Sequence, residues 1–193
     1  MSIFITKADR SGKDSYDLTS YLFAEKRKIQ LLEKIDCINA MTIAYQLEYL
    51  DSISDDDIHL YINSPGGSVS AGLAIVDAIN RCKCDVVTIC TGISASMAAV
   101  IASCGTKGKR YITPFAEIMI HQPHGAASGQ CSDIERKAAH IGQLKHRITE
   151  ILVKNTGKTA KVITAACDRD TYLSAEEAIS FGLADKILST NIF

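Results

Sequence analysis

Between residues 58 and 120, strand-like and helix-like segments alternate, and this alternation limits the possible folds more than any other feature. Apolar residues fall at every second position of residues 58–62, which is the period of a strand. Residues 69–80 carry apolar residues on one helical face, and residues 86–90 are rich in the apolar, β-branched residues of a buried strand. Strands joined by helices favour right-handed crossovers and a mainly parallel sheet. The sequence therefore predicts an α/β fold with βαβ units.

The alternation continues along the chain. Gly92 is predicted to end the second strand, and a helix of small residues is predicted at 96–103, closed by Gly105. Further strands are predicted at 111–112 and 118–120.

A long helix is predicted in the last third of the chain. Ser132 and Glu135 fit a capping box at its start, and Gly157 is predicted to end it. About 23 residues at ~1.5 Å each span roughly 35 Å, as long as the whole domain is expected to be wide. The apolar stripe of this helix either covers the sheet or projects to pair with another subunit, and we favour the second. Ser174 and Glu177 fit a second capping box, which predicts a short helix.

Composition excludes several classes of protein. The 193 residues are 47% hydrophobic and 22% charged, which suits one globular domain, predicted over residues 1–193. Lysine and arginine number 21 against 22 acidic residues, so no basic excess exists for nucleic-acid binding. The longest nearly uncharged apolar run, residues 97–104, is too short for a membrane span. We therefore expect no nucleic-acid and no membrane partner.

We expect a cytoplasmic protein. Residues 1–4 lack the basic flank and apolar stretch of an export signal. The seven cysteines are odd in number and scattered, which suits a reducing compartment better than a disulfide framework.

Three polar segments that contain or adjoin glycine follow predicted strands, at residues 63–68, 92–96 and 121–125. Ligand sites of parallel sheets form at the carboxyl ends of strands, so these segments predict a site. A serine at a strand-to-helix turn, Ser94 or Ser96, would lie where helix N–H groups favour an oxyanion, as in a nucleophile elbow, although the G-x-S-x-G pattern is absent. The alternative is that the serine only caps the helix.

The other polar segments carry similar alternatives. Gly66 and Gly67 let a backbone approach a ligand closely, or form a plain turn, and no Walker loop follows them. His121 is a candidate general base, or a histidine bonded for structure. His121 and His124 also suggest a metal, but no acidic ligand accompanies them in the sequence, so we predict no metal site. Asp170 is a candidate acid in a loop, where carboxylates are usually only solvated.

Four motifs together resemble one family. They are residues 61–67 (YINSPGG), 95–97 (ASM), 119–123 (MIHQP) and 169–178. In this order and spacing they resemble ClpP, the proteolytic subunit of the Clp protease, along nearly the whole chain. The resemblance implies a ClpP/crotonase-type layered parallel sheet with a protruding handle helix.

The resemblance also implies roles for single residues. Ser96 would be the nucleophile, His121 the general base, and Asp170 the residue that orients the imidazole. Gly67 and Met97 would supply the N–H groups of the oxyanion hole. The residues expected to bind substrate are Gly67, Ser68, Val69, Pro123 and His124. Of these, His124 stands where the family usually has Leu, beside the cut bond.

The expected partners follow from the same resemblance. Residues 125–157 would be the handle region that joins two stacked rings of seven subunits, and Asp168 and Arg169 would lie at the ring–ring contact. An AAA+ Clp ATPase of the ClpX, ClpC or ClpA type would supply unfolded proteins and use the ATP, so this chain needs no cofactor of its own. In the expected docking cleft Tyr61 fits the family, but three positions depart from it: His59, Arg81 and Thr113. We therefore predict weakened or altered docking, and consider mixed assembly with a second ClpP-like subunit.

The resulting hypothesis is a self-compartmentalised serine endopeptidase that cuts peptides alone and unfolded proteins with an ATPase. One alternative is a crotonase-type enzyme acting on acyl-CoA thioesters, which leaves Ser96, His121 and Asp170 without a joint purpose. Another is a ring subunit with weak or no activity that regulates or scaffolds a second ClpP-like subunit. The presence of Ser96, His121 and Asp170 together argues against this second alternative, but a sequence alone does not show whether the three side chains are aligned.

Overall fold

The computed structural model describes residues 3–9 and 12–189. Its helices are α1 (Leu18–Lys26), α2 (Cys37–Ile53), α3 (Val69–Arg81), α4 (Met97–Ser103), α5 (Cys131–Thr156), α6 (Ala160–Ala166) and α7 (Ala175–Phe181). Its strands are β1 (Phe4–Asp9), β2 (Gly12–Asp17), β3 (Lys28–Leu31), β4 (Ile58–Ser64), β5 (Val86–Ala95), β6 (Arg110–Ile112), β7 (Glu117–Ile120), β8 (Thr171–Leu173) and β9 (Lys186–Ile187). The predicted domain 1–193 and the absence of an export signal in residues 1–4 also involve residues outside the described ranges.

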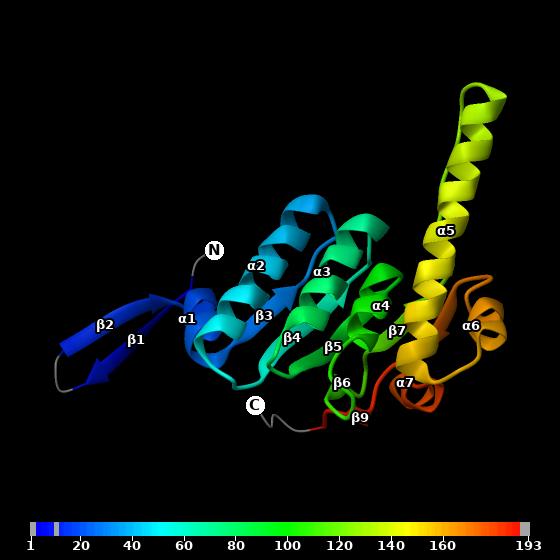
Figure 1. Ribbon diagram of the computed structural model, residues 1–193. Coiled ribbons are helices and arrows are strands. Elements are labelled where there is room, and N and C mark those ends of the chain that lie inside the picture. Colours follow the sequence, from blue (N-terminus) through cyan, green and yellow to red (C-terminus); the bar gives the residue numbers. More distant parts are fainter. Residues whose placement is uncertain (1–2, 10–11, 190–193) are drawn as a thin grey trace.

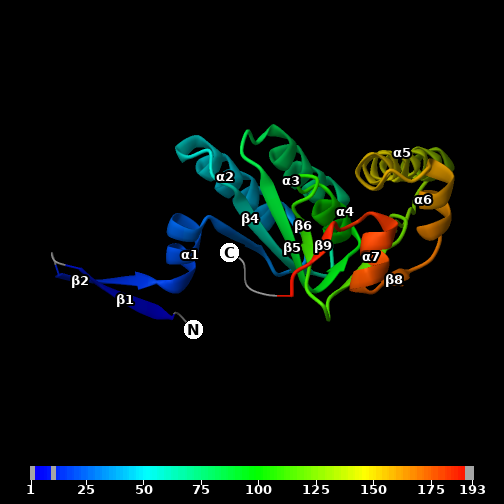
Figure 2. The same ribbon diagram turned by 90° about the horizontal axis from the view of Figure 1, so that it is seen from below.

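A mainly parallel sheet forms the centre of the molecule. Strands β3, β4, β5, β6 and β9 lie side by side in parallel, β7 pairs in parallel with the end of β5, and β8 pairs antiparallel with β7. Helices α2, α3 and α4 pack next to one another on one face of this sheet (Figures 1 and 2). Strands β1 and β2 form a separate antiparallel hairpin that extends away from the sheet. The predicted α/β fold with βαβ units is therefore confirmed.

Strand β5 does not end at Gly92, so that part of the prediction was wrong. The first half of β5 pairs with β6, and the second half, from Ile93 to Ala95, pairs with β7. Gly92 lies between the two halves with φ +70°, a conformation that glycine adopts without strain, and the strand continues with a changed neighbour. The side-chain oxygen of Asn63 accepts a hydrogen bond from the Ile93 N–H at 3.1 Å. The extra three residues carry the chain to the end of β7.

Helix α4 lies in the middle of the core, which explains its composition. All seven of its residues are buried, and alanine makes up three of them. Small side chains let α4 approach β5, β4 and β7 closely enough to share one core with α3. The N-terminus of α4 is thereby fixed relative to three strand ends.

Helix α5 projects beyond the sheet, as predicted, and its first half stands clear of the other elements (Figure 1). It begins at Cys131 after Gln130, and no side chain caps it, so the predicted capping box of Ser132 and Glu135 was wrong. The predicted end at Gly157 is confirmed, with φ +73°. Only two of its residues are buried, Ile148 and Leu152, both in the second half. Among the described helices, none combines the length and hydropathy that a membrane crossing requires.

Helix α7 begins as the sequence predicted. The Ser174 hydroxyl accepts a hydrogen bond from the Glu177 N–H, and the Glu177 carboxylate accepts one from the Ser174 N–H. Gly182 ends the helix at φ +94°. This capping box follows directly after β8 and fixes the direction in which the chain leaves the sheet.

Candidate active site

Ser96 lies between the end of β5 and the start of α4, in an unusual backbone conformation. Its φ of +57° and ψ of −122° are rare for a residue with a side chain, and such strain is kept only where the surroundings enforce it. The Ser96 N–H donates to the Met119 carbonyl at 2.8 Å, which continues the pairing of β5 with β7. The side chain makes no capping hydrogen bond, so the alternative that Ser96 only caps the helix is wrong. The hydroxyl is therefore free to face the sheet edge.

Three side chains form a hydrogen-bonded series at this edge. The Ser96 Oγ lies 2.8 Å from His121 Nε2, and His121 Nδ1 lies 2.9 Å from Asp170 Oδ1. These distances suit an imidazole that carries its proton on Nδ1, donates it to the carboxylate, and accepts the serine proton at Nε2. The His121 side chain is 16% exposed and that of Asp170 is 54% exposed. The arrangement has the order of contacts that activates a serine hydroxyl as a nucleophile.

The pairing of β7 with β8 explains why His121 and Asp170 meet. Ile120 at the end of β7 pairs with Thr171 at the start of β8, and the two strands run antiparallel. The residue after Ile120 and the residue before Thr171 are therefore brought to the same end of the pair. A hydrogen bond of 2.7 Å from the Gln122 N–H to the Cys167 carbonyl continues this contact. The local sequence pattern around Asp170 does not predict this pairing of β7 with β8, because β8 is only three residues long.

The turn with two glycines lies directly against Ser96. A Cβ atom on Gly66 would come within 2.5 Å of the Ala95 carbonyl oxygen and 2.8 Å of the Ser96 Cβ, and Gly66 has φ +84°. A side chain on Gly67 would meet the Ile35 backbone at 2.3 Å. Within the described part of the chain, no hydrogen bond uses the N–H of Gly67 or of Met97. Both predicted oxyanion donors are thus available at the turns next to the Ser96 hydroxyl.

An open cleft of about 490 Å³ runs past the serine. Ser96, His121 and Leu144 line it together with residues of both polar turns. The predicted substrate-binding residues all belong to its lining: Gly67, Ser68, Val69, Pro123 and His124. The structure therefore brings these five residues to one surface beside the Ser96 hydroxyl.

His124 also contacts the histidine of the series, which the sequence did not predict. Its Nε2 lies 3.1 Å from His121 Nδ1, and the two rings are tilted with centroids 4.6 Å apart. Asp170 therefore joins His121 and His124, and the three potential ligand atoms all lie within 4.8 Å of one another. The argument that no acidic group accompanies the two histidines was wrong, because Asp170 arrives from a distant segment. Only the tertiary pairing of β7 and β8 brings it there.

The expected ring-contact residues lie on the far side of Asp170. Asp168 and Arg169 are exposed and line a second hollow of about 280 Å³ with His121 and Asp170. The Arg169 guanidinium makes its only hydrogen bond in the described chain to the neighbouring Asp168 carbonyl, at 2.9 Å. The two side chains also form an exposed ion pair with each other, at 3.5 Å.

Buried thiols offer no competing nucleophile. Burial raises the pKa of Cys90 and that of Cys167 to about 11, so both remain protonated at neutral pH. Cys90 lies on β5, the strand that leads to Ser96, and Cys167 lies three residues before Asp170.

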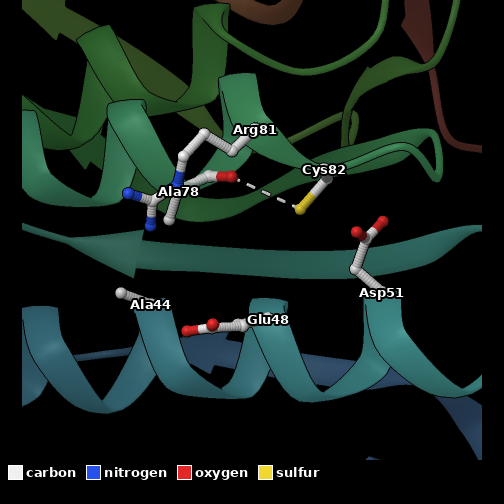
Figure 3. Close-up of a pocket in the computed structure, with 6 residues that line it drawn as sticks. All are labelled: Ala44, Glu48, Asp51, Ala78, Arg81 and Cys82. Atoms are coloured by element: carbon white, nitrogen blue, oxygen red, sulfur yellow. Dashed lines mark hydrogen bonds between the residues drawn. The ribbon is translucent and has the colours of Figure 1, made fainter.

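Arg81 lies in a groove between α2 and α3. The groove has a volume of about 190 Å³, and Arg81 and Cys82 lie across it from Glu48 and Asp51 of α2 (Figure 3). Arg81 is exposed, so in this subunit it carries no cost of burying an unpaired charge. The remaining docking positions are absent from the lining of this groove: His59, Tyr61 and Thr113.

Comparison with known sequences agrees with this geometry. Residues 10–191 match the sequence model of the Clp protease family. This chain belongs to the Clp protease family. Two curated relatives, from Streptococcus pyogenes serotype M5 (strain Manfredo) and serotype M49 (strain NZ131), are each named ATP-dependent Clp protease proteolytic subunit. Each is 47% identical to this chain over 183 residues, which cover 93% of both sequences.

Membership in the Clp protease family confirms the predicted family, fold class and function, a Clp-type proteolytic subunit with serine peptidase chemistry. It does not favour the alternative of a ring subunit that only regulates or scaffolds. The length of the match also agrees with a resemblance that extends along nearly the whole chain.

Proposed function

We propose that the chain is a serine endopeptidase in which Ser96 is the nucleophile, His121 the general base and Asp170 the group that orients the imidazole. The observation that carries the proposal is the series of contacts of 2.8 Å and 2.9 Å that joins these three side chains. A structural histidine would not need a serine at a strained turn on one side and a carboxylate on the other.

The geometry supports the following sequence of steps. Ser96 Oγ attacks the peptide carbonyl while its proton passes to His121 Nε2, and the negative charge on the carbonyl oxygen accepts hydrogen bonds from the N–H groups of Gly67 and Met97. The imidazolium, stabilised by Asp170, then gives its proton to the leaving amine, which departs from the acyl-enzyme. Water reacts in the same way and releases the acid, and the proton returns to Ser96.

The handle region, residues 125–157, is proposed to join two stacked rings of seven copies of this chain. The first half of α5 supports this, because most of its residues are exposed and its apolar residue Ile134 is 40% exposed. The exposed pair of Asp168 and Arg169 next to Asp170 supports a ring–ring contact that affects the active site. The domain is then one unit over residues 1–193.

An AAA+ Clp ATPase of the ClpX, ClpC or ClpA type is the proposed partner for unfolded proteins, in the cytoplasm, and ATP is consumed there and not by this chain. The names of the two relatives, which include the words ATP-dependent, support this partner. His59, Arg81 and Thr113 differ from the expected docking residues, so we propose that docking is weakened, or that a second ClpP-like subunit supplies part of the docking surface.

Replacing the nucleophile tests the proposal. We expect Ser96→Ala to abolish both peptide hydrolysis and labelling by a fluorophosphonate, because no other group takes the place of the hydroxyl. Ser94→Ala is the matched control: Ser94 is a buried serine two residues earlier on β5, and its loss leaves the contacts of Ser96 intact. Native mass spectrometry of the labelled protein measures stoichiometry and labelling together. Hydrolysis by purified Ser96→Ala at the unmodified rate would disprove the assignment.

A further inference from the structure

We propose that His121, His124 and Asp170 form a binding site for one divalent transition-metal ion of the zinc type, and that the bound ion switches the peptidase off. The metal site stands on its own geometry, whereas the switch rests on the function proposed above. None of the proposed hydrolytic steps requires a metal, so the ion would be an inhibitor and not a cofactor.

The distances between the ligand atoms suit such an ion. His121 Nδ1 lies 2.9 Å from Asp170 Oδ1 and 3.1 Å from His124 Nε2, and the three atoms lie within 4.8 Å of one another. A tetrahedral zinc ion with bonds of ~2.0–2.1 Å places neighbouring ligand atoms about 3.3 Å apart. Small movements of the three side chains are therefore enough to close the site around an ion.

The ligand types select among metals. Two imidazole nitrogens and one carboxylate oxygen suit zinc and neighbouring first-row metals, whereas magnesium and calcium prefer oxygen ligands. Three protein ligands leave a fourth position for water. The hollow of about 280 Å³ that all three residues line is open, so an ion has a path to them.

The surrounding chain holds the ligands near one another before any ion arrives. The pairing of Ile120 with Thr171 fixes the segments of His121 and Asp170, as described above. Pro123 restricts the backbone between the two histidines, and their rings already lie in contact. A site that needs little rearrangement loses little conformational entropy on binding.

Metal binding would remove the base by changing the tautomer of His121. A neutral imidazole has one proton and one free lone pair. When the Nδ1 lone pair binds the ion, the proton must leave Nδ1 and is carried on Nε2, by exchange through water, with no net loss of a proton and no electron transfer. Ser96 then faces an N–H donor at 2.8 Å in place of the lone pair that should accept its proton. The hydroxyl cannot be activated until the ion leaves.

His124 is the one ligand of the three that lies outside the series of Ser96, His121 and Asp170. His124→Leu therefore removes one ligand and leaves the other two, Ser96 and the fold in place. His146→Leu is a matched control, since His146 is also an exposed histidine beside a carboxylate, that of Glu150 at 3.3 Å, but on α5.

Calorimetry tests the site without any need for activity. Zinc chloride is titrated into assembled Ser96→Ala protein and into the same protein with His124→Leu or with His146→Leu. We expect the first and third proteins to bind one more zinc ion per chain than the second, while the cysteines contribute equally to all three. An equal number of bound ions with and without His124 would overturn the metal site.

Labelling of Ser96 by a fluorophosphonate tests the switch in the active protein. We expect zinc to slow labelling by about 10²-fold or more, the usual contribution of a general base, and a chelator to restore it. In His124→Leu the ratio of the rates with and without zinc should stay near one. Calorimetry first shows that zinc fills the site. If zinc then does not slow the labelling of Ser96, the switch is overturned. Absent labelling even after chelation would instead contradict the proposed function, and calorimetry would still decide the metal site.

Discussion

Ser96 is held in place by its neighbours and not by its own preference. A residue with a side chain at φ +57° costs about 1–3 kcal/mol relative to ordinary backbone, and that cost is offset by contacts elsewhere. Here the Ser96 N–H bonds to Met119, and the turn of Gly66 fills the space beneath the Ser96 Cβ. The position of the hydroxyl therefore depends on residues that never touch the substrate.

Adding a methyl group at Gly66 should displace Ser96, the proposed nucleophile. We expect Gly66→Ala to lower kcat by about 10²-fold or more, because its Cβ would lie 2.5 Å from the Ala95 carbonyl, and misplacement by about 1 Å costs that much. Gly108→Ala is the control: Gly108 has a similar φ of +87° but no atom within 4 Å of the added Cβ. Peptidase assays of both variants separate the effect of the steric clash from the effect of placing alanine at a positive φ. Equal activities of the two variants would contradict a role for the clash.

Asp170 should affect the rate of peptide hydrolysis by setting the tautomer of His121. We expect Asp170→Asn to lower kcat by about 10⁴-fold, as when the wrong imidazole tautomer is stabilised in a serine triad. The amide can donate to Nδ1, which leaves the proton on Nε2 and no acceptor for Ser96. Steady-state peptide hydrolysis measures the loss, and an unchanged melting temperature shows that the fold is retained. Asp170→Asn at the full rate would remove Asp170 from the mechanism.

Sequence patterns predicted the elements well where the core decides them and poorly where it does not. The capping box at Ser174 is present, whereas the one at Ser132 is not, because the first turns of α5 are exposed and no packing fixes where that helix starts. Gly92 looked like the end of a strand because its effect depends on a second neighbour, β7, which a local pattern cannot show. The contact of His124 with His121 was missed for the same reason.

The two serines predicted to cap helices, Ser174 and Ser132, offer a direct comparison, because only Ser174 does so. We expect Ser174→Ala to lower the melting temperature by about 2–4 °C, since losing a helix cap costs about 1 kcal/mol. Ser132→Ala should change it by less than half of that, because Ser132 caps nothing in α5. Differential scanning calorimetry of both variants at one protein concentration measures the shifts. A larger shift for Ser132→Ala would mean that the start of α5 is packed in the assembled protein.

One buried ion pair ties distant parts of the molecule together. Asp185, just before β9, accepts hydrogen bonds from the Arg110 side chain at 2.6 Å and 2.9 Å and from the Gly108 N–H at 2.7 Å. The Arg110 guanidinium also donates to the Asn155 carbonyl of α5 at 3.0 Å. Burial opposes ionisation of Asp185, but the hydrogen bonds and charge of Arg110 outweigh it and lower the pKa. The Arg110 side chain thus links the sheet, through Asp185, with α5, through the Asn155 carbonyl.

This lowered pKa predicts how stability changes with pH. The carboxyl of Asp185 has a lower pKa in the folded protein than in the unfolded chain. Its contribution to folding stability is therefore fully present above the unfolded pKa of about 3.9, and it is lost as the pH falls through the folded pKa. Asp185→Asn should cost roughly 3 kcal/mol at pH 7, because Arg110 is left buried without its partner. The difference in melting temperature between the two proteins should shrink as the pH falls from 7 to 3, because the contribution of Asp185 begins to be lost near its unfolded pKa. A constant difference across this range would exclude the mechanism.

Gln122 connects the long helix with the catalytic loop through a single amide. Its oxygen accepts from the Lys145 ammonium on α5 at 2.8 Å, and its nitrogen donates to the Asp168 carbonyl at 3.1 Å. A small tilt of α5 would therefore move Gln122, the residue after His121, and the segment that carries Asp170. Through this one amide, the position of α5 bears on the spacing between His121 and Asp170.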